Sequence, residues 1–261
     1  MERMALVSDV HGNLTAYEAV LADIDRRGID RIFNLGDYVG KGPRGREVIE
    51  LSQQRCEVNL LGNWDDFLPD PNRKFDDEAL RFWLSQLRPG QGDWLRSLPF
   101  SHDFWLSGRR VRLFHASEET VHRRVRYVRT QDEFEALFRH TEATEDGPVP
   151  DLIGYADTHD PMYEVQLEGR TVFNTGSVGN CMGDPTPMYC ILEGEVGSEE
   201  TAPWAVSYVR VPYDVEAELA VAREMGMPHY DGYELELRHG IYRGSLEEWR
   251  VGEPVTGYHE R

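Results

Sequence analysis

The sequence lacks the features of secreted and membrane proteins. Its 261 residues include only three cysteines, Cys56, Cys181 and Cys190, and no Cys-x-x-Cys pair, so we expect a reducing compartment rather than a disulfide framework. No apolar run approaches the roughly 20 residues that cross a bilayer. The N-terminus has no charged segment followed by a long apolar one. We therefore expect a cytoplasmic protein with no membrane association.

Basic residues are scarce as well. The chain has 28 lysines and arginines against 47 acidic residues, which gives a formal charge of -19 at pH 7. A field of that sign repels the phosphates of duplex nucleic acid and of anionic membranes, so neither is expected as a partner. The hydrophobic content of 40% is enough for one substantial core, and we expect a single domain over residues 1–261.

The first third of the chain alternates strand-like and helix-like segments. Apolar runs at 4–10, 31–37 and 56–65 are separated by helical patterns at 14–27 and 45–54. This β-α-β-α-β order predicts parallel strands that are covered by helices. Residues 76–98 also have a helical pattern, and Asp76 is the expected N-cap. The stretch LRPGQGDWLRSLPF at 87–100 indicates a helix-turn-helix connection.

The later part of the chain has the pattern of β-hairpins. Ser107-Gly108 and Glu168-Gly169 each lie between two apolar runs, as turn residues do in hairpins. We expect a second sheet of more antiparallel character. Residues 141–150 read as a polar loop, and no pattern can be read from about residue 228 onward.

Polar side chains follow several of the predicted strands, at the point where each strand ends. They are Asp9 and His11 after the first run, Asp37 after the second, Asn63 after the third, and His115, Asp157 and His159 after later runs. The carboxyl ends of neighbouring parallel strands meet at one edge of a sheet, where open α/β folds place their sites. All seven side chains offer oxygen or imidazole nitrogen atoms and none is a thiolate, so they predict a metal site.

Each of these motifs alone also has an ordinary structural interpretation. An Asp-x-His segment commonly caps a turn, Gly-Asp and Gly-Asn are frequent in turns, and a lone half-buried histidine is usually satisfied by hydrogen bonds. The fixed order of the motifs, all at predicted strand ends, is what favours a functional site.

The motifs resemble those of a known family. Asp9-Val10-His11, Gly36-Asp37, Gly62-Asn63-Trp64-Asp65, His115 and Thr158-His159 resemble the calcineurin-like metallophosphoesterases, whose pattern is D-x-H, G-D, G-N-H-D/E, H and G-H-x-H. The stretch NTGSVGN at 174–180 is similar to the small bacterial phosphodiesterase branch. The resemblance covers about residues 5–192, which leaves about 193–261 as a C-terminal extension. It implies an α/β fold, a four-layer αββα sandwich of two mixed sheets flanked by helices.

The resemblance also implies roles for the residues. One metal ion would be held by Asp9, His11, Asp37 and His159, and Asp37 would bridge to a second ion held by Asn63, His115 and, in place of a family histidine, Asp157. The expected ions are Mn and Fe, with Zn and Ni as further candidates. The implied reaction is attack on phosphorus by a bridging hydroxide. Asp37, Asn63 and Asp65 would be catalytic.

Two positions depart from the family pattern. Asp157 replaces a histidine; it either ligates the second metal, where an oxygen donor favours Mn or Fe, or is a partner of His159 beside a weak second site. Trp64 replaces the histidine that stabilises the transition state or protonates the leaving oxygen, and an indole cannot supply that proton near neutral pH. Trp64 is then a buried wall, a stacking face for a base or aryl group, or both.

Basic residues near the motifs are candidates for binding phosphate. Lys41 and Arg44 lie in GDYVGKGPRG, which resembles the G-D-x-x-x-R-G-P loop of protein phosphatases and dinucleoside tetraphosphatases; an exposed turn is the alternative. The basic stretch 121–129 either binds an anion or, as we favour, is a solvated face.

The predicted function is hydrolysis of phosphomonoesters or phosphodiesters at a dinuclear metal centre. The substrate would be a small phosphorylated molecule, and nucleotides are among the candidates. The alternatives are a hydrolase of nucleotide anhydrides such as dinucleoside polyphosphates, and a catalytically silent protein that binds metal or nucleotide. The sequence leaves the oligomeric state open.

Overall fold

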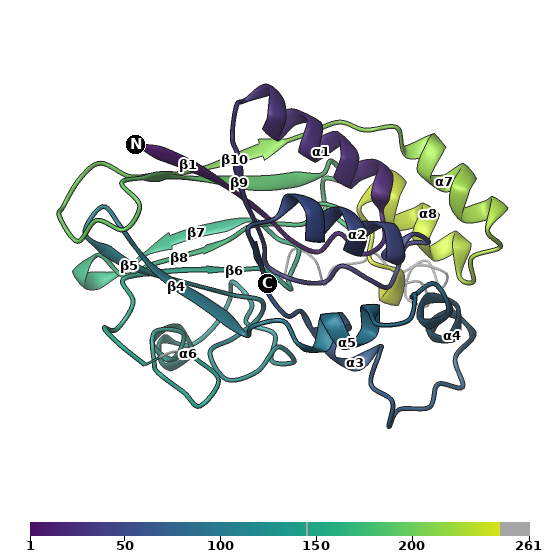
Figure 1. Ribbon diagram of the computed structural model, residues 1–261, viewed down its shortest axis with the longest axis horizontal. Coiled ribbons are helices and arrows are strands. Elements are labelled where there is room, and N and C mark those ends of the chain that lie inside the picture. The colour runs from purple at the N-terminus through teal and green to yellow at the C-terminus, as the bar shows by residue number, and fades with distance from the viewer. Residues whose placement is uncertain (145, 246–261) are drawn as a thin grey trace.

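Two five-stranded mixed sheets face each other and carry helices on their outer faces (Figure 1). The computed structural model describes residues 1–144 and 146–245. Part of the predicted loop at 141–150 and the end of the C-terminal extension lie outside the described residues. The predicted α/β fold, an αββα sandwich of two mixed sheets, is confirmed.

The first sheet has the strand order β10-β9-β1-β2-β3. Its strands are β1 (Glu2–Val7), β2 (Arg31–Asn34), β3 (Val58–Asn59), β9 (Met188–Gly194) and β10 (Ala205–Arg210), and the helices α1 (Leu14–Arg26) and α2 (Gly45–Arg55) connect the first three. Strands β1, β2 and β3 are parallel, as predicted, and β9 and β10 extend the sheet with antiparallel pairing. The third strand is shorter than predicted. Asn63 does not end it but begins the short helix α3 (Asn63–Phe67), because Asp65 caps that helix by accepting from the Gly62 N–H.

The second sheet has the strand order β4-β5-β6-β8-β7. Its strands are β4 (Ser101–Leu106), β5 (Arg109–Phe114), β6 (Leu152–Tyr155), β7 (Met162–Val165) and β8 (Thr171–Asn174). Both predicted hairpins are present, with the turn at Ser107-Gly108 between β4 and β5 and the turn at Glu168-Gly169 between β7 and β8. The three inner strands β5, β6 and β8 are nevertheless parallel, because long connections separate them along the chain.

The core is divided between the layers by the alternation of side chains along each strand. In β1, Ala5 and Val7 pack with the helices α1 and α2, whereas Met4 and Leu6 pack between the two sheets. The short helix α6 (Gln131–Ala136) covers the outer face of the second sheet. Burial on both faces explains why β1 reads as a continuous apolar run.

Two further helices follow α3. They are α4 (Glu78–Ser85) and α5 (Gln91–Arg96), which lie within the predicted helical stretch 76–98 and agree with the predicted helix-turn-helix connection. The N-cap of α4 is Asp77 rather than the predicted Asp76, because the Asp77 carboxylate accepts from the N–H of Leu80 at 3.0 Å.

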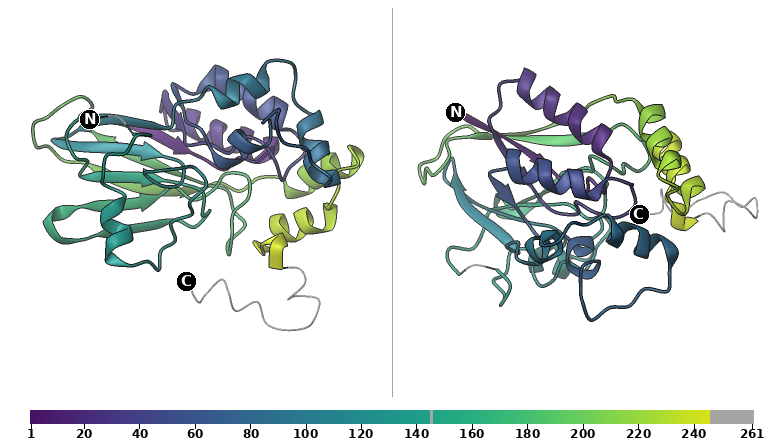
Figure 2. Two further views of the ribbon diagram at one scale, coloured as in Figure 1. Left: turned by 90° about the horizontal axis from the view of Figure 1, so that it is seen from below. Right: turned by 45° about the vertical axis from the view of Figure 1, so that its right-hand side comes forward.

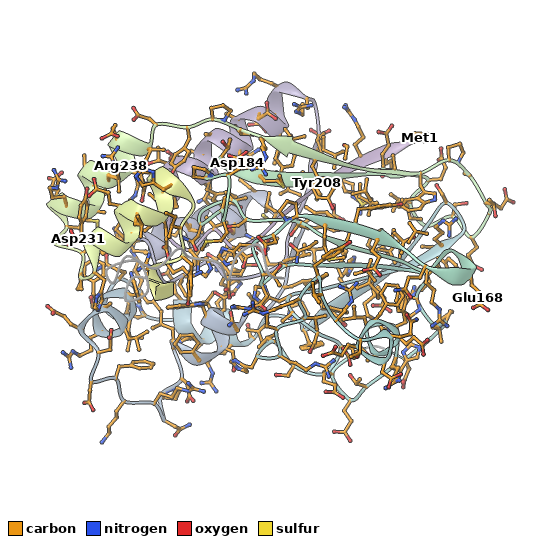
Figure 3. The ribbon with its side chains drawn as sticks, turned by 180° about the vertical axis from the view of Figure 1, so that it is seen from behind. Met1, Glu168, Asp184, Tyr208, Asp231 and Arg238 are labelled. Carbon is orange, nitrogen blue, oxygen red and sulfur yellow. The ribbon has the colours of Figure 1, made fainter. Side chains whose placement is uncertain are left out.

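The C-terminal extension packs against the strand ends that carry the predicted ligands. It forms β10, α7 (Val215–Glu224), α8 (Tyr230–His239) and a 3-10 turn at Arg243–Ser245, and α7 contacts both α1 and α8 (Figure 2). Asp231 and Arg238 of α8 lie at the opposite end of the molecule from Glu168 (Figure 3). None of the helices in the described part of the chain has the length and apolar character needed to cross a bilayer.

Candidate active site

The predicted ligands lie on strained turns after the strands. Five of the seven have φ between 48° and 62°, a region that residues other than glycine rarely adopt and that is frequent at functional sites: Asp9, His11, Asp37, Asp157 and His159. The turns support one another, since the backbone N–H of Asp9 donates to the Gly36 carbonyl at 2.9 Å. Gly62 is required for the close approach, because a Cβ atom there would lie 2.3 Å from both the backbone nitrogen and Oδ1 of Asp37.

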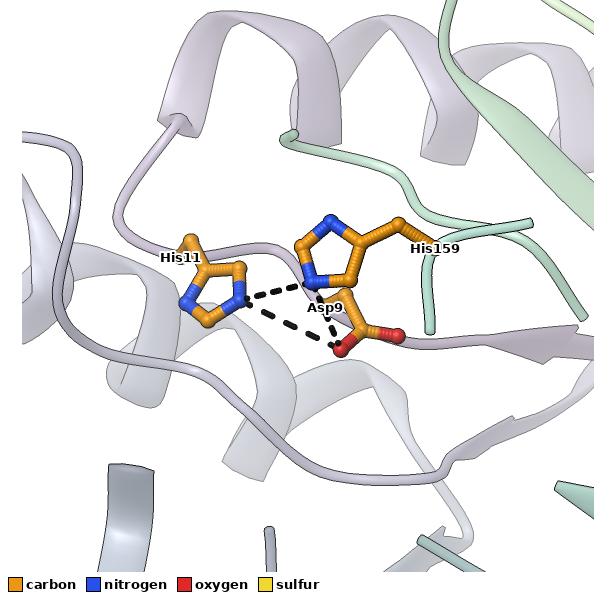
Figure 4. A group of neighbouring side chains, drawn as sticks. All are labelled: Asp9, His11 and His159. Atoms are coloured by element: carbon orange, nitrogen blue, oxygen red, sulfur yellow. Dashed lines mark hydrogen bonds and ion pairs between the residues drawn. The ribbon is translucent and has the colours of Figure 1, made fainter. Parts of the chain in front are cut away.

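Asp9, His11 and His159 form a first group of buried side chains with their ligand atoms facing one another (Figure 4). The Nε2 atoms of His11 and His159 are 3.3 Å apart. Oδ1 of Asp9 lies 3.4 Å from Nε2 of His159 and 3.9 Å from Nε2 of His11. These three atoms are close enough to bind one ion together.

Asp37 links this group to a second one, which consists of Asp9, Asp37 and His115. Oδ2 of Asp37 lies 3.4 Å from Nε2 of His11, and Oδ1 lies 3.5 Å from Nε2 of His115. The two oxygens of one carboxylate therefore face different histidines.

The three histidines are all oriented by backbone carbonyl groups. Nδ1 of His11 lies 3.0 Å from the carbonyl oxygen of Val39, and Nδ1 of His115 lies 2.8 Å from that of Leu35. Nδ1 of His159 likewise contacts the carbonyl oxygen of Asn180. Because a carbonyl only accepts, Nδ1 carries the proton and Nε2 faces the centre. Burial lowers the pKa of His11 and of His159, which favours an unprotonated Nε2. Burial also lowers the pKa of His115, but Asp37 and Asp9 outweigh it and raise that pKa to about 10, so an ion bound there would displace a proton.

The centre contains buried polar atoms that a cation would satisfy. Both carboxylate oxygens of Asp9, Oδ1 of Asn63 and Nε2 of His115 are buried without a hydrogen-bond partner among the described residues. Burial raises the pKa of Asp9 to about 7, which reflects the unfavourable energy of an unpaired buried carboxylate. Oxygen and imidazole donors suit Mn, Fe and Zn, so the residues fit the metal ions that the resemblance implies.

Asp65 shapes the turn that carries Asp37. Its carboxylate is fully buried and accepts from the backbone N–H groups of Asp37 at 2.7 Å, Tyr38 at 3.0 Å and Gly62 at 3.0 Å. These contacts give Asp65 a positioning role. Its direct part in catalysis stays a prediction.

Trp64 forms a wall of the centre. Its indole meets the His11 ring edge-on at 5.7 Å between centroids and packs against Phe67 and Trp83. A Cβ atom at Gly40 would lie 2.1 Å from the indole, so glycine is needed for this packing. Trp64 is half-buried, and its use as a stacking face stays a prediction.

Lys41 and Arg44, the two predicted phosphate-binding residues, lie in different surroundings. Lys41 is buried, and its Nζ lies 3.3 Å from Nε2 of His159 and 2.9 Å from Oδ1 of Asn180, so it faces the centre. Arg44 pairs with the buried Glu218 of α7. This ion pair ties the start of α2 to the C-terminal extension, and a role of Arg44 in binding substrate stays a prediction.

Asp157 belongs to neither ligand group. Its two oxygens lie 3.0 Å from Nε and 3.0 Å from Nη2 of Arg124. Its role as a metal ligand stays a prediction. Other members of the basic stretch 121–129 pair with acidic residues, as in the ion pairs of His122 with Asp66 and of Arg129 with Glu164.

Three residues that support the centre were not predicted from the sequence: Asn180, Glu236 and Arg243. Asn180 donates to Glu236 of α8 at 2.8 Å, and Arg243 donates to the same carboxylate at 2.7 Å. The spacing of the apolar residues Tyr233 and Leu237 would have placed Glu236 on the buried face of α8.

Comparison with known proteins identifies the family. The model of the calcineurin-like phosphoesterase superfamily domain matches residues 3–197. The chain belongs to this superfamily. It is accordingly a metal-dependent phosphoesterase.

Solved structures and a sequence relative are similar over nearly the whole chain. The metallophosphoesterase from Sphaerobacter thermophilus is 28% identical with a TM-score of 0.70, over 92% of this phosphoesterase and 99% of that chain. A hypothetical protein from Pyrococcus horikoshii OT3 has the same fold, with a TM-score of 0.72 at 19% identity over 93% of this chain and 100% of that one. An uncharacterised protein of Methanocaldococcus jannaschii is 27% identical over 90% of this chain and 97% of its own length.

Proposed function

We propose that this phosphoesterase hydrolyses small phosphomonoesters or phosphodiesters at a centre of two metal ions. The observation that carries the proposal is the Asp37 carboxylate, whose two oxygens face His11 and His115. One ion would be held by Asp9, His11, Asp37 and His159, and the other by Asp37, Asn63 and His115. The buried oxygens of Asp9 and Asn63 that have no hydrogen-bond partner support this assignment.

The residues around the ions would bind and orient the substrate. When bound, the ions neutralise charge on the phosphoryl group and lower the pKa of the attacking water. Lys41 places a positive charge beside His159, where it can meet a phosphate oxygen. Asp65 holds the Asp37 turn, and Trp64 closes one side of the centre against water.

Hydrolysis of nucleotide anhydrides is a second candidate, and Trp64 favours it. The indole N–H cannot supply a proton to a leaving alkoxide, whereas a phosphate leaving group depends less on protonation. The substrate would in either case be a small phosphorylated molecule rather than duplex nucleic acid, because the chain carries a charge of -19.

The test is turnover by protein that is stripped with a chelator and then loaded with Mn²⁺. We expect hydrolysis of an aryl phosphate only in the loaded protein, and its loss in His159→Ala. His229→Asn is the control, because His229 is exposed and its left-handed backbone accepts asparagine. A panel of an aryl monoester, an aryl diester and a dinucleoside polyphosphate separates the candidates. No turnover of any of them by the loaded protein would contradict the proposal and favour a silent binding protein.

A further inference from the structure

Arg124 and Asp157 form an ion pair at the edge of the centre. The guanidinium meets the carboxylate side-on through Nε and Nη2, with both distances at 3.0 Å. The Asp157 side chain is only 3% exposed, whereas the Arg124 side chain is 46% exposed. One partner is therefore fixed in the protein and the other reaches solvent.

The side-on geometry leaves the outer edge of the guanidinium available. Of the five N–H bonds of an arginine, this pairing uses one on Nε and one on Nη2. The structure gives Arg124 no other hydrogen-bond partner within residues 1–144 and 146–245. The remaining N–H bonds on Nη1 and Nη2 form a fork that matches two oxygens of one phosphate.

The position of Arg124 is set by buried contacts. The next residue, Val125, is buried, and its carbonyl accepts from the hydroxyl of the buried Tyr155 at 3.0 Å. Asp157 lies on the turn after β6, where the Ala156 N–H donates to the carbonyl of His115 at 2.8 Å.

Arg124 lies beside the centre because its partner Asp157, at 3.0 Å, is two residues before the candidate ligand His159. A second positive charge therefore lies near the candidate ligands, in addition to Lys41.

Asp157 stands where the family has a metal-ligating histidine, but both of its oxygens already bind a guanidinium. A metal ion at the same oxygens would compete with Arg124 and would be repelled by its charge. We propose that Arg124 binds the substrate phosphate and that Asp157 holds the guanidinium in place instead of completing the shell of the second metal. This inference rests on the proposed phosphoester hydrolysis.

The substrate class follows from the number of phosphate oxygens. A phosphodiester has two non-bridging oxygens, whereas a terminal phosphoryl group has three. Because the metal ions would also bind non-bridging oxygens, the third oxygen of a terminal phosphoryl group leaves one more for Arg124. Arg124 therefore selects substrates that end in a phosphoryl group, such as monoesters, over diesters.

The test is titration of inorganic phosphate into Mn²⁺-loaded protein by calorimetry, with the Mn content measured on the same samples. We expect Arg124→Gln to bind phosphate about 10- to 100-fold more weakly, the range for loss of charge-assisted hydrogen bonds, with unchanged Mn content. The ratio of kcat/KM for an aryl monoester to that for the matching diester should fall about tenfold in this variant. Arg126→Gln is the control, because Arg126 is exposed on the same stretch.

Asp157→Asn separates the two roles of the carboxylate. If Asp157 positions Arg124, this variant weakens phosphate binding and keeps its Mn. Loss of one Mn per chain in Asp157→Asn, or wild-type phosphate affinity in Arg124→Gln, would overturn the inference while the proposed function stands. A loaded wild-type protein that neither binds phosphate nor hydrolyses an aryl monoester would overturn both.

Discussion

Two basic side chains lie beside the candidate metal ligands in opposite surroundings. Lys41 is 7% exposed, and Asn180, Glu236 and Arg243 surround it with a buried hydrogen-bonded network that we call the His159 side. Arg124 is 46% exposed and, among the described residues, is held by Asp157 alone, on what we call the Asp157 side. A buried cation is in place before the substrate arrives, whereas an exposed one can adjust to it. The difference suggests that the His159 side orients the reacting group and the Asp157 side selects the substrate.

Between these two sides lie the candidate ligands, and Asp37 faces His11 with one oxygen and His115 with the other, so its substitution should have the largest effect. We expect Asp37→Asn to lower kcat/KM by more than about 100-fold, the upper range for residues that only orient metal ligands. The fold should persist, and far-ultraviolet circular dichroism checks it. Asp66→Asn is the matched control, because Asp66 is 42% exposed and pairs with His122. If Asp37→Asn kept most of its turnover when loaded with metal, the Asp37 carboxylate would not be the group that both metal ions share.

The His159 side should be sensitive to loss of the Glu236 charge. Glu236→Gln replaces the carboxylate that pairs with Arg243 by a neutral amide, so we expect the free energy of unfolding to fall by about 3 kcal/mol. Because Asn180 loses its anchor, kcat/KM should fall about 10- to 100-fold. Urea unfolding and steady-state kinetics measure the two effects. Glu234→Gln, on the same helix, should change stability by less than about 1 kcal/mol, because Glu234 is 32% exposed and pairs with Arg238. Equal behaviour of the two variants would show that the network does not support the centre.

Substitution of Trp64 tests whether Lys41, on the His159 side, donates a proton to the leaving oxygen in addition to supplying positive charge. Burial lowers the pKa of Lys41 to about 8, which is within reach of an acid near neutral pH. If no group protonates the leaving oxygen, Trp64→His should raise turnover of alkyl monoesters about tenfold relative to aryl ones, short of the ~10²–10⁴ of a well-positioned acid. His122→Ala, assayed in parallel, excludes the other nearby imidazole, which Asp66 holds at 2.8 Å. An unchanged alkyl-to-aryl ratio in Trp64→His would mean that an acid is already present.

The smallest expected effect is a difference between Arg124 and Lys41 in how their contributions to phosphate affinity depend on salt. Raising the ionic strength from about 0.05 to 0.5 M screens exposed charges far more than buried ones. We expect the Arg124 contribution to phosphate affinity to shrink severalfold, measured as the ratio of wild type to Arg124→Gln. The corresponding ratio for Lys41→Gln should change little. Equal salt dependence of the two ratios would remove the distinction between the sides.

The convergence of the strand-end side chains could be predicted from the sequence because the β-α-β pattern is regular. Once the strands are parallel, Asp9 and Asp37 must reach the same edge of the sheet. The position of Asn63 was predicted less well. It begins a helix, because the Asp65 cap overrides the apolar run before it.

The contacts around Lys41 and Arg124 could not be predicted in the same way. Arg124 and Asp157 are 33 residues apart on two irregular segments, so no local pattern brings them together. The apolar spacing of Tyr233 and Leu237 indicates that Glu236 lies on the buried face of α8, but it does not show what the carboxylate contacts. Only the packing of α8 against the centre brings Glu236 to Asn180 and Arg243.

The most direct test of the metal centre is anomalous diffraction from crystals grown with Mn²⁺, measured above and below the Mn absorption edge. We expect one peak bonded to Asp9, His11, Asp37 and His159 and another bonded to Asp37, Asn63 and His115, so that both peaks share Asp37. Both Asp157 oxygens should remain on Arg124. Crystals that hold Mn²⁺ elsewhere with no peak among these ligands would contradict the account of the centre. A Mn–Asp157 bond would contradict the division into two sides.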